Sequence, residues 1–132
     1  MSGYSGTPLA KKLGIKENFR VAFHKLPAEV KAELEAALAS SKSASSQLDF
    51  AMIFVSSRVE VEKEFACYAN RLVPAGMLWV SWPKKISKVA TDLNDDVIRE
   101  IGLANRLVDV KVCAVSEIWS GLKFVVPLRD RV

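Results

Sequence analysis

Cysteine, histidine and glycine are scarce in this chain of 132 residues, which holds two cysteines, one histidine and six glycines. The spacing of Cys67 and Cys113 does not match a metal site, and a disulfide between them does not follow from the sequence. No stretch approaches the roughly eighteen apolar residues of a membrane span, and the first seven residues lack the apolar core of a signal peptide. We therefore expect a cytoplasmic protein with reduced thiols, no metal and no membrane partner.

Neither positive nor negative charge is in large excess. Nineteen lysines and arginines against fifteen aspartates and glutamates give a net charge of +4, and the position of this excess matters more than its size. Hydrophobic residues make up 50% of the chain, which is typical of a globular protein. The length is sufficient for a buried core, and we expect one domain spanning residues 1–132.

A short helix, a strand and a second helix are predicted in the first forty residues. The first helix has Thr7 as its cap, Pro8 at its first position and Gly14 at its end. Residues 19–24 predict a strand with Phe19, Val21 and Phe23 on one face. Pro27 opens the second helix, whose apolar residues recur at helical spacing. The spacing holds for Val30, Leu34, Ala37 and Leu38.

The serine-rich residues 40–47 predict a flexible loop. Residues 48–55 form a nearly unbroken apolar run, which suits a strand covered on both faces, as in a parallel sheet. A helix follows, stopped by residues 74–76, and residues 77–81 predict another strand buried on both faces. The apolar stripe of that helix comprises Val61, Phe65, Tyr68, Ala69 and Leu72.

A further helix from Asn94 to about Gly102 precedes a predicted hairpin, in which strands over 108–115 and 122–126 flank the turn at 116–121. Strands and helices thus alternate until the final hairpin. This order predicts an α/β fold with right-handed crossovers between parallel strands.

Short passages of the sequence resemble two groups of known proteins. Residues 72–81, LVPAGMLWVS, resemble the helix–PGG–strand passage of S-adenosylmethionine-dependent methyltransferases, and the final helix and hairpin resemble the end of that Rossmann-like fold. Residues 3–14 (GYSGTPLAKKLG), 82–85 (WPKK) and 108–115 (VDVKVCAV) resemble an uncharacterised family of small bacterial proteins. The resemblances imply a bacterial, cytoplasmic origin and a three-layer, truncated Rossmann-like fold with a C-terminal antiparallel hairpin.

The sequence departs from the methyltransferase pattern after its first strand. In that fold the first strand leads into a glycine-rich turn that approaches the cofactor, whereas here it leads into His24, Lys25, Leu26 and Pro27. The second strand of that fold, which ends in the acid that binds the cofactor ribose, and its neighbour are both missing from the predicted order. We therefore expect no ordinary S-adenosylmethionine or NAD site and assign no cofactor.

Ligands of open parallel sheets bind beyond the carboxyl ends of the strands, and cations and tryptophans follow several of the predicted strands. A helix N-terminus after Arg58 adds to this expected anion site. The candidate ligand-binding residues are His24, Lys25, Ser57, Arg58, Trp82, Lys84, Lys85, Lys88, Glu117 and Trp119.

Each candidate also has an ordinary structural interpretation. Ser57 is also typical of the N-cap of the following helix. His24 is also typical of an ordinary polar residue at the end of a strand. Trp82 and Trp119 are large enough to be core residues. The lysines at 84, 85 and 88 are typical of solvated loop charges, and the acids at 92, 95 and 96 suit a helix first turn better than a metal site.

The preferred hypothesis is a non-enzymatic, methyltransferase-like module that binds an anionic small molecule or a phosphate-bearing partner. One alternative is an atypical transferase, with His24 and Glu117 as candidates for proton transfer. Another is an interaction or homo-oligomerisation module, because loss of two strands leaves the first strand at a sheet edge that the N-terminal segment or another subunit must cover. Nucleic acid is a weaker candidate, since +4 is low for a protein that binds a phosphate backbone.

Overall fold

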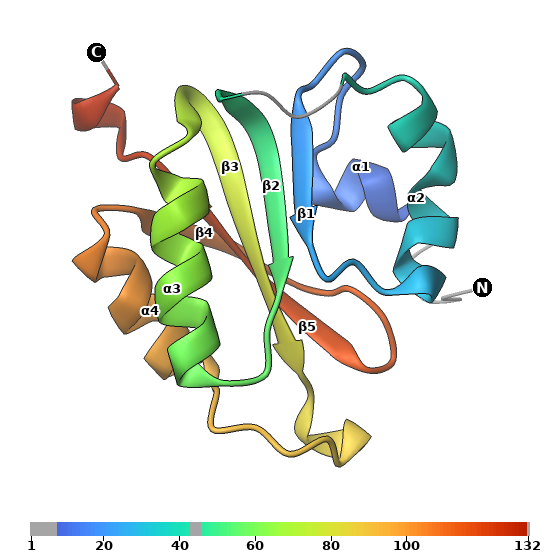
Figure 1. The fold of residues 1–132 in the computed structure, drawn as a ribbon, viewed down its shortest axis with the longest axis vertical. Coiled ribbons are helices and arrows are strands. Elements are labelled where there is room, and N and C mark those ends of the chain that lie inside the picture. Colours follow the sequence, from blue (N-terminus) through green and yellow to red (C-terminus); the bar gives the residue numbers. More distant parts are fainter. Residues whose placement is uncertain (1–7, 43–45, 132) are drawn as a thin grey trace.

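A computed structural model describes residues 8–42 and 46–131, so the expected cap Thr7 lies outside the described residues. The described part is a mixed sheet with helices on both faces (Figure 1). Its elements are α1 (Leu9–Leu13), β1 (Val21–His24), α2 (Ala28–Ala39), β2 (Leu48–Phe54), α3 (Arg58–Ala69), β3 (Leu72–Pro83), the 3-10 turn η1 (Lys85–Ser87), α4 (Asp95–Ala104), β4 (Val108–Ala114), β5 (Trp119–Val125) and η2 (Leu128–Asp130).

The five strands form one sheet in the order β1-β2-β3-β5-β4. β1, β2 and β3 are parallel, and β5 is antiparallel to both of its neighbours, β3 and β4. β4 therefore runs in the same direction as β3, and the β4–β5 turn lies at the same edge of the sheet as the carboxyl ends of β1, β2 and β3. This arrangement is the truncated Rossmann-like α/β fold that the sequence predicts, with the first strand at the sheet edge.

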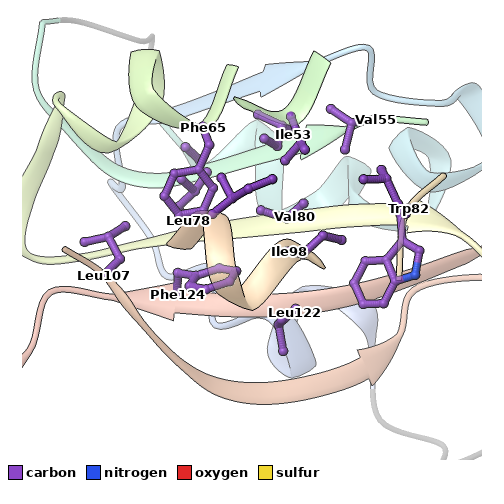
Figure 2. Close-up of a cluster of buried hydrophobic side chains, with 14 of the residues drawn as sticks. Ile53, Val55, Phe65, Leu78, Val80, Trp82, Ile98, Leu107, Leu122 and Phe124 are labelled. Atoms are coloured by element: carbon purple, nitrogen blue, oxygen red, sulfur yellow. The ribbon is translucent and has the colours of Figure 1, made fainter. Parts of the chain in front are cut away.

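Two hydrophobic cores lie on opposite faces of the sheet because successive strand residues point to opposite sides. The first core packs α3 and α4 against the sheet, and Figure 2 shows Phe65 of α3 beside Leu78 and Ile98 of α4 near Val80. The second core packs α1 and α2 against the other face, around the fully buried Trp79. β2 is buried on both faces, as its unbroken apolar sequence predicts.

The first two crossovers differ in hand. β1 to β2 and β2 to β3 are steps in the same direction across the sheet, but α2 belongs to one core and α3 to the other. In Figure 1 the parallel strands point downward, β3 lies to the left of β2, and α3 lies in front, so β2–α3–β3 is right-handed. The β1–α2–β2 crossover is consequently left-handed, a departure from the prediction and from the common rule.

The chain achieves this unusual crossover by passing around the outer edge of β1. Lys42 donates its backbone N–H to the carbonyl of Phe19 at 2.8 Å and forms an isolated parallel bridge with Arg20. The N–H of Asn18 donates to the carbonyl of Ser40 at 2.9 Å. Residues 40–42 therefore occupy part of the edge at which a neighbouring strand would pair.

The boundary between α3 and β3 differs from the prediction. α3 ends at Ala69, and Leu72 is already a strand residue rather than part of the helical stripe. Residues 74–76 do not stop the helix but lie inside β3, where the register to β2 shifts. Gly76 has no positive φ, but a Cβ there would meet the carbonyl oxygens of Leu48 and Val73 at 3.0 Å.

Helix termini follow the predicted signals more closely. Gly14 adopts the left-handed conformation at φ 86° and ends α1, while Pro8 is the N-cap of α1 rather than its first helical residue. The side chain of Asn94 accepts the N–H of Val97 at 2.9 Å and starts α4. No helix in residues 8–42 and 46–131 is long and apolar enough to cross a membrane.

Candidate functional site

The carboxyl ends of β1 and β2 meet the first turns of α3 in a cluster centred on Glu60. The Glu60 carboxylate accepts hydrogen bonds from Lys25 Nζ at 2.8 Å, from His24 Nε2 at 2.9 Å and from the Ser56 backbone N–H at 3.1 Å. Glu64, one helical turn later, lies 3.5 Å from the other ring nitrogen of His24. The single histidine thus lies between two carboxylates.

This environment keeps Glu60 ionised. Burial of the carboxylate raises its pKa, but the hydrogen bonds from Lys25, His24 and Ser56 outweigh this effect and lower the pKa from 4.5 to about 2. The same contact with Glu60 raises the pKa of Lys25. Lys25 itself has a left-handed backbone at φ 56°, a conformation that costs energy in a residue other than glycine. Lys25 is therefore paired within the protein rather than free to bind an external anion.

The N-terminus of α3 is also occupied by groups of the protein. The Ser57 hydroxyl accepts the N–H of Glu60 at 3.2 Å, which confirms the N-cap interpretation of Ser57. The N–H of Arg58 donates to the Asp92 carboxylate at 2.8 Å. The Arg58 guanidinium lies 3.5 Å from both Glu62 and Glu100. Two of the backbone N–H groups that could bind a phosphate at this helix start, those of Arg58 and Glu60, are therefore already used.

A second group of candidate residues surrounds the loop after β3. The N–H of Lys84 donates to the carbonyl of Ile118 at 2.8 Å, which joins this loop to the β4–β5 turn. A shallow pocket of about 480 Å³ lies between the two segments. Its lining consists of Lys84, Ile86, Ser87, Glu117 and Ile118. Lys85 and Lys88 are exposed on the same loop.

The two candidate tryptophans do not converge. Trp82 is 8% exposed and belongs to the core beneath α3 and α4 (Figure 2). Trp119 packs on the other face of the sheet, edge-on to Phe54 with ring centroids 5.2 Å apart. Both are core residues, as the ordinary interpretation predicts, although Trp119 is only partly buried.

The structure divides the ten predicted residues into separate groups. His24, Lys25, Ser57 and Arg58 lie among the carboxylates of α3, and the three loop lysines lie with Glu117. His24 and Glu117 were the pair considered for proton transfer. β2 and β3 separate His24, on β1, from Glu117, in the β4–β5 turn. The sequence reasoning overlooked Glu60, although the spacing Ser57-x-x-Glu60 is that of a capping box and signals a carboxylate directed back to the helix start.

The aspartates before and in α4 have structural roles. Asp95 and Asp96 lie in the first turn of α4 and pair with Arg99 at 3.1 and 3.6 Å. Asp92 caps α3. Within residues 8–42 and 46–131, no group of three or more histidine, cysteine or acidic side chains is arranged to hold a metal ion.

The residues after β1 do not fit S-adenosylmethionine in its usual position. The backbone there offers Lys25, Leu26 and Pro27 where close approach of a cofactor requires glycine. The Lys25–Glu60 ion pair lies across the end of the strand. β1 is an edge strand, so no adjacent strand in the described sheet supplies an acid for the cofactor ribose.

Comparisons with known proteins support the fold only. No protein-family profile and no curated protein matches the sequence. The chain is structurally similar to magnesium protoporphyrin IX methyltransferase from Synechocystis PCC 6803 with bound SAM, at a TM-score of 0.56 and 12% identity, covering 89% of this chain and 74% of the other.

Two further solved structures are similar over most of the chain. The Methanococcus jannaschii fibrillarin pre-rRNA processing protein has a TM-score of 0.52 at 10% identity, covering 95% of this chain and 71% of that protein. An S-adenosylmethionine-dependent methyltransferase from Clostridium acetobutylicum ATCC 824 has a TM-score of 0.51 at 10% identity, covering 80% of this chain and 74% of the other. The chain has a methyltransferase-like fold.

Proposed function

We propose that this protein is a non-catalytic, methyltransferase-like binding module whose ligand is a phosphate-bearing small molecule held by the loop after β3. The observation that carries the proposal is the contrast between the two groups of cations. Lys25 and Arg58 are paired with carboxylates, whereas Lys84, Lys85 and Lys88 form no ion pair with any described carboxylate.

The position and the chemistry of this loop support the same proposal. It follows the carboxyl end of a parallel strand, where ligands of open α/β sheets bind. Lys84 and Glu117 line the same pocket of about 480 Å³, which thus borders both a cation and a hydrogen-bond acceptor. Lysines bind phosphate as point charges, and a carboxylate accepts hydrogen bonds from hydroxyl groups. A ligand that carries both groups, such as a nucleotide or a sugar phosphate, therefore suits the pocket.

Calorimetric titration of nucleotides and polyphosphates into the wild-type protein and the Lys84→Glu/Lys85→Glu variant tests the proposal. We expect wild-type binding that weakens with salt and a loss of at least tenfold in affinity in the variant, because two attractions become repulsions. Lys31→Glu/Lys63→Glu changes the net charge equally on exposed helix positions and should bind like wild type. Equal affinity of all three proteins, or binding by none of them, would remove the proposal.

An atypical transferase is the second candidate, favoured by the fold of the similar structures and by the contact of His24 with Glu60. In this case Glu60, rather than Glu117, is the carboxylate within reach of the histidine. The candidate requires a cofactor bound outside the usual position after β1. Binding of S-adenosylmethionine to the purified protein separates it from the preferred function.

A further inference from the structure

A pair of lysines lies face to face on the sheet away from the loop after β3. Lys111 of β4 is the direct partner of Lys123 of β5 in the antiparallel register. Side chains at such positions project from the same face, with Cβ atoms about 5 Å apart, and like charges there destabilise a sheet.

Other lysines surround the pair. Partial burial and the positive charges of Lys111 and Lys16 lower the pKa of Lys123. The Nζ atom of Lys111 donates to the carbonyl of Lys12 at 2.8 Å, which fixes this lysine beside the end of α1. A Cβ built at Gly14 would lie 3.8 Å from Lys123 Nζ, so both lysines border the same end of α1.

The lysines of this face, Lys16, Lys111 and Lys123, have no carboxylate partner among the described residues, although Glu17 directly follows Lys16 in the chain. Residues 8–16 contain no acid, and Glu117 is the single acid of residues 110–125. The acids of the chain are instead concentrated on the helices, at Glu29, Glu33, Glu35, Glu60, Glu62, Glu64, Asp95, Asp96 and Glu100.

We propose that this basic face, formed by Lys16, Lys111 and Lys123, binds the phosphate backbone of a nucleic acid. The lysines come from three segments, so they suit several phosphates along a strand better than one enclosed anion. The small net charge of +4 conceals a segregation of charge between this face and the helices. This inference goes beyond the small-molecule function and does not depend on the loop after β3.

The position of the lysines determines the kind of binding. Lysine contacts to phosphates carry no sequence information and depend strongly on salt. Each neutralised phosphate contributes about 0.9 to the slope of the logarithm of affinity against the logarithm of salt concentration for a duplex, and about 0.7 for a single strand. Three lysines therefore predict a slope of about 2 to 3 and no preference among sequences.

Fluorescence anisotropy with a labelled DNA duplex and a labelled single-stranded RNA tests the inference at several salt concentrations. We expect binding by the wild-type protein and at least a tenfold weakening in Lys111→Glu. This variant turns a repulsive cross-strand pair into an attractive one but removes the hydrogen bond to the Lys12 carbonyl, so its melting temperature is measured beside its binding and must match that of the control. Lys63→Glu, at an exposed position of α3, is the matched control and should bind within about threefold of wild type.

Three outcomes would overturn the inference. The first is no binding of either nucleic acid by the wild-type protein at low salt. The second is an equal loss in Lys111→Glu and Lys63→Glu, which would reflect net charge alone. The third is displacement of the nucleic acid by polyglutamate at equal charge concentration, which would assign the face to an acidic protein. Because Lys84 and Lys85 are unchanged in these variants, failure here leaves the small-molecule proposal intact.

Discussion

The indole N–H of Trp79 donates to the carbonyl of Leu13 at 2.8 Å, and both residues are completely buried. This bond joins the middle of β3 to the end of α1. It satisfies a helix C-terminal carbonyl that has lost its intrahelical partner.

Replacement of Trp79 by phenylalanine should destabilise the protein clearly. The change leaves the buried Leu13 carbonyl without a partner, which costs about 1–3 kcal/mol, and adds a cavity. Trp82→Phe is the matched control, because Trp82 is similarly buried but makes no hydrogen bond through its indole to a described residue. Chemical denaturation measures both. Equal losses of unfolding free energy would show that the Trp79 bond contributes nothing beyond volume.

Substitution of Gly102 by alanine should also destabilise the protein, although alanine is intrinsically favoured in a helix by about 1 kcal/mol. A Cβ at this position of α4 would overlap the ring of Phe124, and overpacking of a core costs about 1–3 kcal/mol. Thermal denaturation of Gly102→Ala, Phe124→Leu and the double variant provides a double-mutant cycle. The smaller side chain at 124 should relieve the clash, so strictly additive losses would contradict this account.

The stability of the wild-type protein should fall between about pH 5 and pH 2 through Glu60. Its folded-state pKa of about 2 lies below the ordinary value of 4.5, so ionised Glu60 stabilises the fold at higher pH and this contribution is lost as the pH falls through the folded pKa. The gap corresponds to on the order of 3 kcal/mol. Glu60→Gln should be less stable at pH 6 and should lose this part of the pH dependence.

Denaturation midpoints of wild type and Glu60→Gln measured from pH 6 to pH 2 check this prediction. Glu33→Gln, at an exposed position of α2, is the control and should follow the wild-type curve. If the plots of denaturation midpoint against pH for wild type and Glu60→Gln remain parallel over the whole range, the hydrogen bonds from Lys25 and His24 do not lower the pKa of Glu60.

We expect no measurable binding of S-adenosylmethionine at ordinary concentrations. The cofactor requires close approach to the backbone after the first strand. The side chains of Lys25 and Leu26 obstruct this approach, and Pro27 has no backbone N–H to donate to the cofactor. Titration calorimetry is the measurement. An affinity in the low micromolar range would contradict this expectation and would make the transferase the preferred function.

The sequence predicted the elements whose signals are local. β2 was identifiable because all of its residues from Phe50 onward are apolar, and α4 because Asn94 is a strong cap. The first part of β3 was missed because Pro74, Ala75 and Gly76 are typical of a turn, whereas in the structure they are extended and lie between Leu72 and Met77, which pair with β2 across a register shift. The left-handed crossover was also missed, since its helix signal does not reveal which face of the sheet α2 covers.

The candidate site was predictable in position but not in electrostatics. Strand ends and the residues after them follow from the chain order, so Lys84 and His24 were assigned to the correct edge of the sheet. Whether a cation is available depends on its partners, and Glu60 lies 36 residues from His24. Only the packing of α3 beside the end of β1 brings the two together and removes Lys25 from the set of free charges.

The left-handed crossover has a consequence for how the protein opens. β1 has four residues and pairs with β2 as its only neighbouring strand, with Lys42 bonded at its start, whereas β3 has twelve residues and is paired on both sides. Because the chain passes around the outer edge of β1, this strand and α2 can separate from the sheet without breaking any pairing among β2, β3 and β5. Such a peripheral unit exchanges its backbone amides before the global unfolding transition, so the molecule should contain a cooperative subunit that ends where β2 begins.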